Sequence, residues 1–370
     1  MAFGSISVDK ITDSEGSVFS PTSALFRNRI INGDMRIDQR NAGAAVTVST
    51  SYPVDRFRVV NSTDGSFSAQ QDSSAPAGFV NSVKITTTTA DATLTTTQNL
   101  HFRQDIEGTN IADFAWGTAN AKTITISFWV RSSLTGTFGG TLRNNGGARS
   151  YPFTYSISSA DTWEQKSVTI AGDTSGTWLT TTGVGIICAF ALGAGPDVSG
   201  TAGAWVGANY ISATGTTSVI GTLNATWYIT GVQLEVGSVA TPFERRPYGT
   251  ELALCQRYYE NSFAAGIAVA NNVGAVAFGG ANSINGSNVR SSGIFFKVPK
   301  RTTPTVTPFS PSISGSSAGL WMLYNNAWGN TTATGVADVS SNYFHMSMDS
   351  TTTQNSAYLV SGNWTASAEL

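Results

Sequence analysis

Charged residues are scarce in this sequence. They make up 12% of its 370 residues, about half the share that is usual in globular proteins. Lys and Arg are scattered and the net charge is −2, whereas phosphate binding needs clustered basic side chains. Nucleic acid is therefore not an expected partner. No apolar run reaches the length of a membrane span, so we expect no membrane insertion, and the first residues lack the pattern of a signal peptide.

Cysteine and histidine are nearly absent. Cys188 and Cys255 are too few for a disulfide framework, and their apolar surroundings favour buried free thiols. His101 and His345 have no metal-ligand partner at short spacing. The sequence contains no nucleophile elbow, phosphate loop or HExxH helix. We therefore expect that the chain is not an enzyme, although a catalytic triad assembled only in space would escape a sequence search.

Short alternating segments fill most of the chain, separated by clusters of Gly, Asn, Asp and Ser. Uncharged segments rich in Thr suit β-strands, because β-branched side chains fit a pleated sheet. Many short strands at even spacing predict an all-β protein with a jelly-roll or β-sandwich domain and a second, smaller β-sandwich. The clearest expected strands are 55–60, 83–85, 123–131, 151–157, 164–170, 184–192 and 227–235, then 294–301, 320–324 and 343–348.

One helix interrupts this pattern at 250–260. Thr250 can cap it, and Leu252, Cys255, Tyr258 and Tyr259 lie on one face at three- and four-residue spacing. This segment predicts a short linking helix between the two β-domains. The expected organisation is an N-terminal leader at 1–27, a jelly-roll domain at 28–247, the linking helix at 248–261 and a C-terminal β-sandwich at 262–370.

Two segments carry a family resemblance. The segment 28–40, NRIINGDMRIDQR, opens the first domain, and the segment 229–259, which begins ITGVQLEVG, closes it. Between them, 123–170 contains FWVRS and, later, a Trp-Glu pair at the entry of a strand. The chain resembles bacteriophage tail-fibre or head-fibre proteins of the type common in cyanophages and other marine phages, with a jelly-roll domain like that of carbohydrate-binding modules.

The resemblance implies a virion protein, synthesised in the host cytoplasm, that mediates adhesion to glycans on the host surface. Fibre proteins are usually trimeric, so a homotrimer is implied, with the leader contacting other virion proteins or another subunit. The apolar helix face could form the three-fold contact or pack on its own sandwich. A capsid decoration or cement protein with a purely structural role is the alternative, and a glycan-degrading enzyme is a third possibility.

The resemblance also implies a possible structural calcium ion, because such modules often hold one where their first and last strands meet. Here those strands would offer Asn32, Asp34, Gln233 and Glu235. Calcium takes roughly six to eight oxygen ligands, so these side chains would supply only part of the shell. Ordinary polar residues at strand ends are the alternative interpretation.

Aromatic residues supply the candidates for glycan contact. Sugar rings present CH-rich faces that stack on aromatic rings, while amide groups bind the hydroxyls. Trp129 and Trp227 lie within strands and are expected in the core, and loop tryptophans can also be tucked under their own turns. The candidates for glycan contact are Trp178, Trp205, Trp321, Tyr324, Asn325, Asn326 and Trp328.

Overall fold

The computed structural model describes residues 26–273, 276–283, 288–311, 321–324, 328–330, 333–349 and 357–370, together with the pairs 11–12 and 18–19. The described residues are nearly all β, with a single α-helix, which confirms the predicted fold class. Contacts divide them into two compact units. Unit 1 comprises 26–34, 59–68 and 72–246, and unit 2 comprises 35–58, 69–71 and the described residues from 247 onward. The predicted domain boundary at 247 assigned 35–58 to the first domain, whereas these residues belong to unit 2 with the C-terminal part of the chain.

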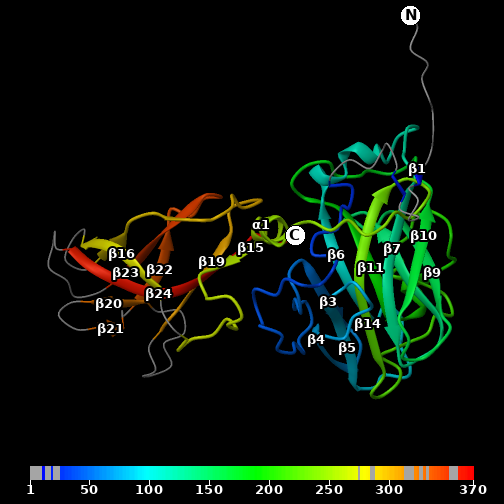
Figure 1. The fold of residues 1–370 in the computed structure, drawn as a ribbon, viewed down its shortest axis with the longest axis horizontal. Helices are drawn as coiled ribbons and strands as arrows, with labels where there is room; N and C mark the ends of the chain where they lie inside the picture. The colour runs from blue at the N-terminus through cyan, green and yellow to red at the C-terminus, as the bar shows by residue number, and fades with distance from the viewer. Residues whose placement is uncertain are drawn as a thin grey trace, which may run out of the picture. The chain divides into compact units, whose positions relative to one another are not determined.

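Unit 1 is built around two five-stranded sheets (Figure 1). The first, in spatial order, contains β10 (Glu164–Ile170), β7 (Ile124–Ser132), β14 (Thr226–Val236), β5 (Ser82–Thr89) and β4 (Ser66–Asp72). The second contains β3 (Phe57–Asn61), β6 (Asn99–Glu107), β11 (Val184–Ala194), β8 (Gly136–Arg143) and β9 (Ser150–Ile157). Smaller elements are η1 (Gly108–Asn110), η2 (Ala112–Phe114), η3 (Pro196–Val198) and the parallel pair β12 (Ser199–Gly200) and β13 (Ser212–Ala213).

Aromatic side chains fill the space between the two sheets of unit 1. The ring of Phe128 on β7 lies 4.9 Å from that of Phe190 on β11 and 5.0 Å from that of Tyr155 on β9. Trp227 is fully buried, as predicted, and its indole N–H donates to the Tyr155 hydroxyl at 3.2 Å. The buried Trp227 N–H and Tyr155 hydroxyl are therefore partners for each other, as burial of polar groups favours.

The parts of the two resemblance segments that belong to unit 1, 28–34 and 229–246, lie side by side. The backbone N–H of Arg29 donates to the carbonyl of Leu234 at 2.8 Å, and that of Val232 donates to the carbonyl of Gly33 at 2.9 Å. Asn28 is buried, and its side chain bonds backbone groups of both Val232 and Leu234. Position 33 must be glycine, because a Cβ there would lie 2.2 Å from the Val232 carbonyl oxygen.

Ten described strands of unit 2 form one connected network around its last strand. They are β15 (Tyr259–Asn261), β16 (Val276–Ser283), β17 (Asn288–Ser291), β18 (Ile294–Phe295), β19 (Thr305–Phe309), β20 (Met322–Tyr324), β21 (Trp328–Asn330), β22 (Ala333–Ala337), β23 (Tyr343–Asp349) and β24 (Ala357–Ser367). Trp321 and Trp364 are the largest side chains of its core. The strand predicted at 294–301 ends at Phe295. The next backbone N–H groups leave the strand pattern, since that of Phe296 donates to the Asn342 carbonyl and that of Lys297 donates to the Glu260 carboxylate.

The helix α1 (Tyr248–Gln256) begins earlier and ends earlier than predicted. Pro247, not Thr250, occupies the N-cap position, and no side chain caps the helix. Proline fixes φ near the helical value and so favours a start just after it. Tyr259 was predicted to be helical, but it begins β15 and pairs with Ser367 of β24. Pairing with a long strand therefore outweighs the helical pattern at this end.

Side chains from 35–58 hold the C-terminal end of the chain in unit 2. Arg40 forms an ion pair with Glu369 at 2.8 Å, and Arg56 forms a second one with the same carboxylate. The Arg40 guanidinium also lies 3.6 Å from the ring centre of Tyr259, and that of Arg56 lies 3.5 Å from that of Tyr258. These cation–π contacts cover two rings of the predicted apolar helix face within the same unit.

Asp55, in the same buried cluster, predicts a dependence of stability on pH. Burial raises its pKa from 3.8 to about 6, although the neighbouring Arg40 opposes the shift. The folded state therefore binds this proton more tightly, and the associated stability is lost as pH rises from 3.8 to about 6. Over this pH range, we expect the free energy of unfolding of wild-type unit 2 to fall by on the order of 2–3 kcal/mol relative to that of Asp55→Asn. Hydrogen exchange of both proteins at several pH values measures the difference, and a constant difference would contradict the prediction.

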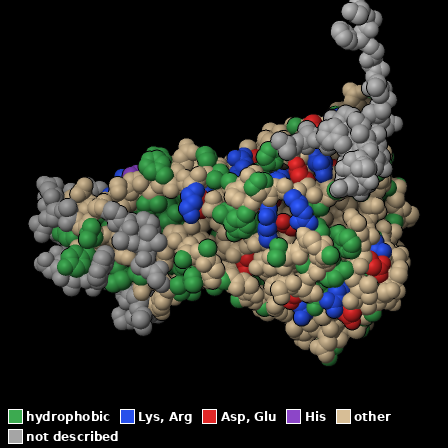
Figure 2. All heavy atoms as spheres, viewed as in Figure 1, with side chains coloured by type: hydrophobic (Ala, Val, Ile, Leu, Met, Phe, Trp, Pro, Cys, Tyr) green, Lys and Arg blue, Asp and Glu red, His purple; other side chains and the backbone are tan. Residues whose placement is uncertain are grey.

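The remaining expectations concern the leader, the thiols and the surface. Most of the predicted leader at 1–27 lies outside the described residues, and within it β1 (Ile11–Thr12) pairs with β2 (Val18–Phe19) of the same chain. Cys188 and Cys255 are buried free thiols, as predicted. None of the helices in the described part of the chain is long and apolar enough to span a membrane. Figure 2 shows charged side chains as small scattered groups on the visible face.

Candidate functional site

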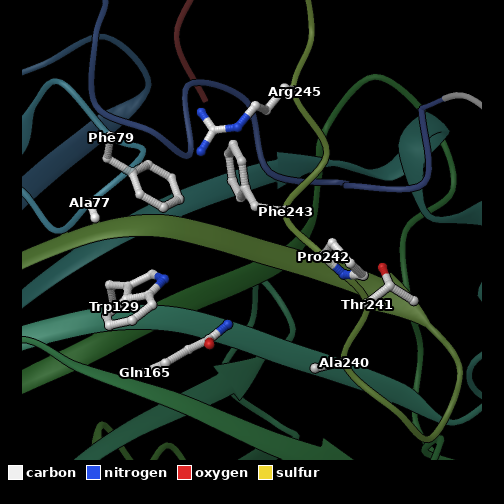
Figure 3. A pocket seen from close by; sticks show the side chains of 9 residues that line it. All are labelled: Ala77, Phe79, Trp129, Gln165, Ala240, Thr241, Pro242, Phe243 and Arg245. Carbon is white, nitrogen blue, oxygen red and sulfur yellow. The ribbon is translucent and has the colours of Figure 1, made fainter. Parts of the chain in front are cut away.

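The outer face of the first sheet of unit 1 carries a hollow of about 550 Å³ (Figure 3). Its floor comes from neighbouring strands, where Trp129 on β7 pairs with Gln165 on β10 and with Thr230 on β14. One wall comes from the segment after β14. The lining residues are Ala77, Phe79, Trp129, Gln165, Ala240, Thr241, Pro242, Phe243 and Arg245. A volume in the range of roughly 300–1,000 Å³ is typical of sites that bind small molecules.

An irregularity in β14 makes room for the aromatic walls of this hollow. The register between β14 and β7 shifts between Thr230 and Gln233, and Gly231 adopts a φ of +62°. A Cβ at position 231 would lie 2.8 Å from the ring of Phe79 and 3.1 Å from that of Trp129. Glycine therefore allows both the left-handed backbone of the bulge and the close approach of the two rings.

Aromatic rings hold Arg245 at the side of the hollow opposite Trp129 (Figure 3). The Phe79 and Phe243 rings meet edge to face with centres 5.2 Å apart. The guanidinium of Arg245 lies 4.7 Å from the centre of the Phe79 ring and 5.8 Å from that of Phe243. Stacking of this kind orients the planar guanidinium, yet it leaves the N–H groups at its edge for other partners.

A buried pair on β14 positions the wall of the hollow. Glu235 accepts hydrogen bonds from the Thr241 backbone N–H at 2.9 Å and from its hydroxyl at 2.7 Å. The Gln233 side-chain oxygen accepts the backbone N–H of Glu244 at 2.7 Å, while its amide donates to Glu235 at 2.8 Å. Both residues are at most 2% exposed. The segment that carries Phe243 and Arg245 is thus fixed at both ends by β14.

Gln233 and Glu235 are two of the four residues predicted as calcium ligands. The Glu235 carboxylate is already surrounded by donors, since Arg27 lies 3.4 Å away in addition to Thr241 and Gln233. Asn32 and Asp34 are also buried, and each has interactions of its own within the chain. In the described part of the chain, no group of three or more His, Cys, Asp or Glu side chains could hold a metal ion. Calcium binding stays a prediction.

Trp178 and Trp205, two of the predicted glycan contacts, pack against each other and against Trp116 in unit 1. The three ring centres are 4.8 to 5.3 Å apart. Each indole N–H donates to a backbone carbonyl, at 3.2 Å for Trp178 and 2.7 Å for Trp205. Trp178 is buried, whereas Trp205 is partly exposed. Their internal hydrogen bonds indicate a cluster that stabilises loops, and Trp205 keeps the more accessible surface.

The other predicted glycan contacts lie in unit 2. Trp321 is fully buried in the core of this unit, so its ring is not accessible to a glycan. Tyr324 is 40% exposed, and its backbone pairs with that of Trp328 between β20 and β21. Asn325 and Asn326 lie outside the described residues. The structure thus leaves Tyr324 as the accessible aromatic side chain described in this predicted cluster.

Sequence reasoning missed the most informative residue of the hollow. Trp129 was predicted in the core, which is wrong, because Phe128 and Val130 point inward and Trp129 lies partly exposed on the outer face. The signal was the alternation of this strand, in which Trp129 shares its face with polar residues. Phe295 was also missed, although it is 72% exposed in unit 2 beside Tyr343.

Asp105 and Glu107, two carboxylates two positions apart on β6, are both buried. Asp105 is 4% exposed and Glu107 is 1% exposed, so neither is a solvated surface charge. Arg103 Nε lies 3.1 Å from Asp105 Oδ1, so these two side chains form an ion pair. These carboxylates belong to the second sheet, whereas the hollow is formed over the first.

Comparison with protein-family models finds no match, and comparison with curated protein sequences finds none either. Among solved structures, the enzymatically active domain of bacteriophage CBA120 tailspike protein 4 matches 57% of this chain and 22% of its own, with 11% identity and a TM-score of 0.32. A family 11 carbohydrate-binding module of Clostridium thermocellum matches 53% of this chain and 96% of its own, with 12% identity and a TM-score of 0.28.

The arrangement on the outer sheet face can bind a ligand that has both an apolar face and polar edges. Trp129, Phe79 and Phe243 provide ring surfaces that a flat CH-rich molecule can contact. Gln165 is exposed at the rim, where its amide can donate and accept hydrogen bonds. Arg245 adds a fixed positive charge. This combination suits reversible binding of a pyranose.

Proposed function

We propose that the chain is a bacteriophage virion fibre or appendage protein that binds host-surface glycans without cleaving them. The hollow formed by Trp129, Phe79, Phe243, Gln165 and Arg245 is the observation that supports this proposal. Single contacts of this kind are weak, but several copies on one particle multiply their effect through avidity. In the proposed arrangement the chain forms a homotrimer, and its leader contacts other virion proteins.

Trp129→Ala tests the proposed site. Removing the ring takes away the floor of the hollow, and we expect affinity for the bound glycan to fall roughly tenfold. Trp129 is partly exposed and lies outside the core between the sheets, so the fold should persist. Binding of the purified protein to a panel of immobilised bacterial polysaccharides, followed by calorimetry with the best ligand, gives the measurement.

Tyr324→Ala is the matched control, because it removes an exposed aromatic ring from unit 2. Loss of binding in Tyr324→Ala alone would move the glycan site to the C-terminal unit. If Trp129→Ala bound glycans as tightly as the wild type, the hollow would not be the glycan-binding site. If the wild type binds no glycan of the panel, the role of a capsid decoration or cement protein is favoured instead.

A further inference from the structure

The lining of the hollow is unbalanced in charge. Among its nine lining residues, Arg245 is the one that carries a formal charge. No ion pair joins Arg245 to a carboxylate in the described part of the chain, and its interactions there are the contacts with Phe79 and Phe243. A ligand in the hollow therefore meets a positive charge that the protein does not neutralise.

The carboxylate next to Arg245 in the sequence is directed elsewhere. Glu244 accepts the backbone N–H of Asn28 at 2.9 Å and forms an ion pair with Arg246 at 3.2 Å. Arg246 is 8% exposed, whereas Arg245 is exposed at the hollow. The two adjacent arginines thus have different roles, since Arg246 stabilises the closing segment and Arg245 faces the site.

We infer that the hollow selects glycans that carry a carboxylate, such as uronic acids. This inference rests on the proposed glycan binding and names the ligand class of the same site. A pyranose lying on Trp129 directs one edge of its ring toward Arg245, across the hollow. The planar guanidinium matches the two oxygens of a carboxylate, and such charged hydrogen bonds are stronger than those to neutral hydroxyls. Because Phe79 and Phe243 already orient the guanidinium, little conformational entropy is lost on binding.

Calorimetry with matched acidic and neutral probes tests the inference. The probes are oligogalacturonate and a glucuronate-containing hexasaccharide, each compared with its carboxyl-reduced form, which keeps the sugar rings and loses the charge. We expect the wild type to bind at least one acidic form about tenfold more tightly than its reduced form. Arg245→Gln should abolish that preference, so that the acidic form and its reduced form bind equally. Arg245→Lys should recover only part of it, because an ammonium group cannot form the paired contact.

Arg290→Gln is the control, because it removes the same charge from an ion pair with Asp338 in unit 2, and it should keep the preference. Equal binding of acidic and reduced forms by the wild type would overturn the inference, as would a preference that survives Arg245→Gln. In both cases, the expected fall in affinity in Trp129→Ala would leave the proposed function standing. Absence of wild-type binding to every acidic and reduced probe overturns the inference and counts against the proposed function as well.

Discussion

Lys300→Ala is expected to destabilise unit 2 by about 3–5 kcal/mol. Lys300 and Glu260 form a salt bridge at 2.6 Å, with side chains 0% and 1% exposed. The ammonium group also donates to the carbonyls of Gln256 and Val298, so all three of its donors are used. Removing the ammonium leaves the Glu260 carboxylate buried without its charged partner, which is the most costly way to break an ion pair.

Two control variants separate this effect from a general loss of packing or charge. Lys297→Ala removes an exposed lysine three positions earlier and should change stability by less than about 0.5 kcal/mol. The double variant Lys300→Met with Glu260→Leu replaces both charges by apolar groups, so it should lose much less than Lys300→Ala alone. Burial lowers the pKa of Lys300 although Glu260 opposes this, consistent with a large desolvation cost.

Peptide-resolved hydrogen exchange measures the effect within one protein. Exchange in β24 and β15 should accelerate in Lys300→Ala, because α1, β15 and the segment around Lys300 meet at this pair. Peptides from β11 in unit 1 provide an internal reference. Unchanged protection of β24 would show that the pair contributes little to the stability of this unit.

Local strand patterns predicted most of unit 1, because exposure alternates along β10 and β11 is a continuous buried apolar run. The strand expected at 164–170 matches β10, and that expected at 184–192 matches most of β11. Unit 2 was harder to predict, because pairing with strands that are distant in the sequence overrides the secondary structure that its local sequence patterns favour. Glu260 lies in an apparent helical pattern, but it pairs with Ala366 of β24 and binds Lys300, contacts that no local sequence window contains.

The candidate site was only partly predictable. The resemblance pointed to the meeting of the first and last strands, and Gln233 and Glu235 were chosen there as calcium ligands. Their position on the closing strand was correct, whereas their hydrogen bonds to Thr241 and Glu244 depend on a turn that the sequence does not specify. Phe79 and Trp129 come together only through the bulge at Gly231. A sequence pattern shows which residues share a strand face, but it does not show which loop covers that face.

Glu235→Ala is expected to cost about 2–4 kcal/mol in unit 1 and to weaken binding of every glycan at the hollow. The variant removes an acceptor of the Thr241 N–H and hydroxyl and of the Gln233 amide. One such loss costs about 1–3 kcal/mol when the donor stays buried and unpaired. The part-buried Thr241 groups can bind water, and the Gln233 amide keeps other acceptors, so the three losses do not add in full. The segment that carries Phe243 and Arg245 would then detach from β14. Because the ring of Trp129 remains, the affinity should fall without a change in preference among ligands that do not reach Arg245.

Asp113→Ala is the matched control for this variant, because its carboxylate belongs to an exposed ion pair with Arg29 in the same unit. Exposed pairs contribute at most about 1 kcal/mol, so this variant should bind as the wild type does. Thermal unfolding and calorimetry with one ligand, each with and without calcium, give both readouts. Wild-type affinity in Glu235→Ala would show that the hollow does not need its anchored wall. Stabilisation of the wild type by calcium that Glu235→Ala abolishes would instead assign this carboxylate to an ion, as the family resemblance implies.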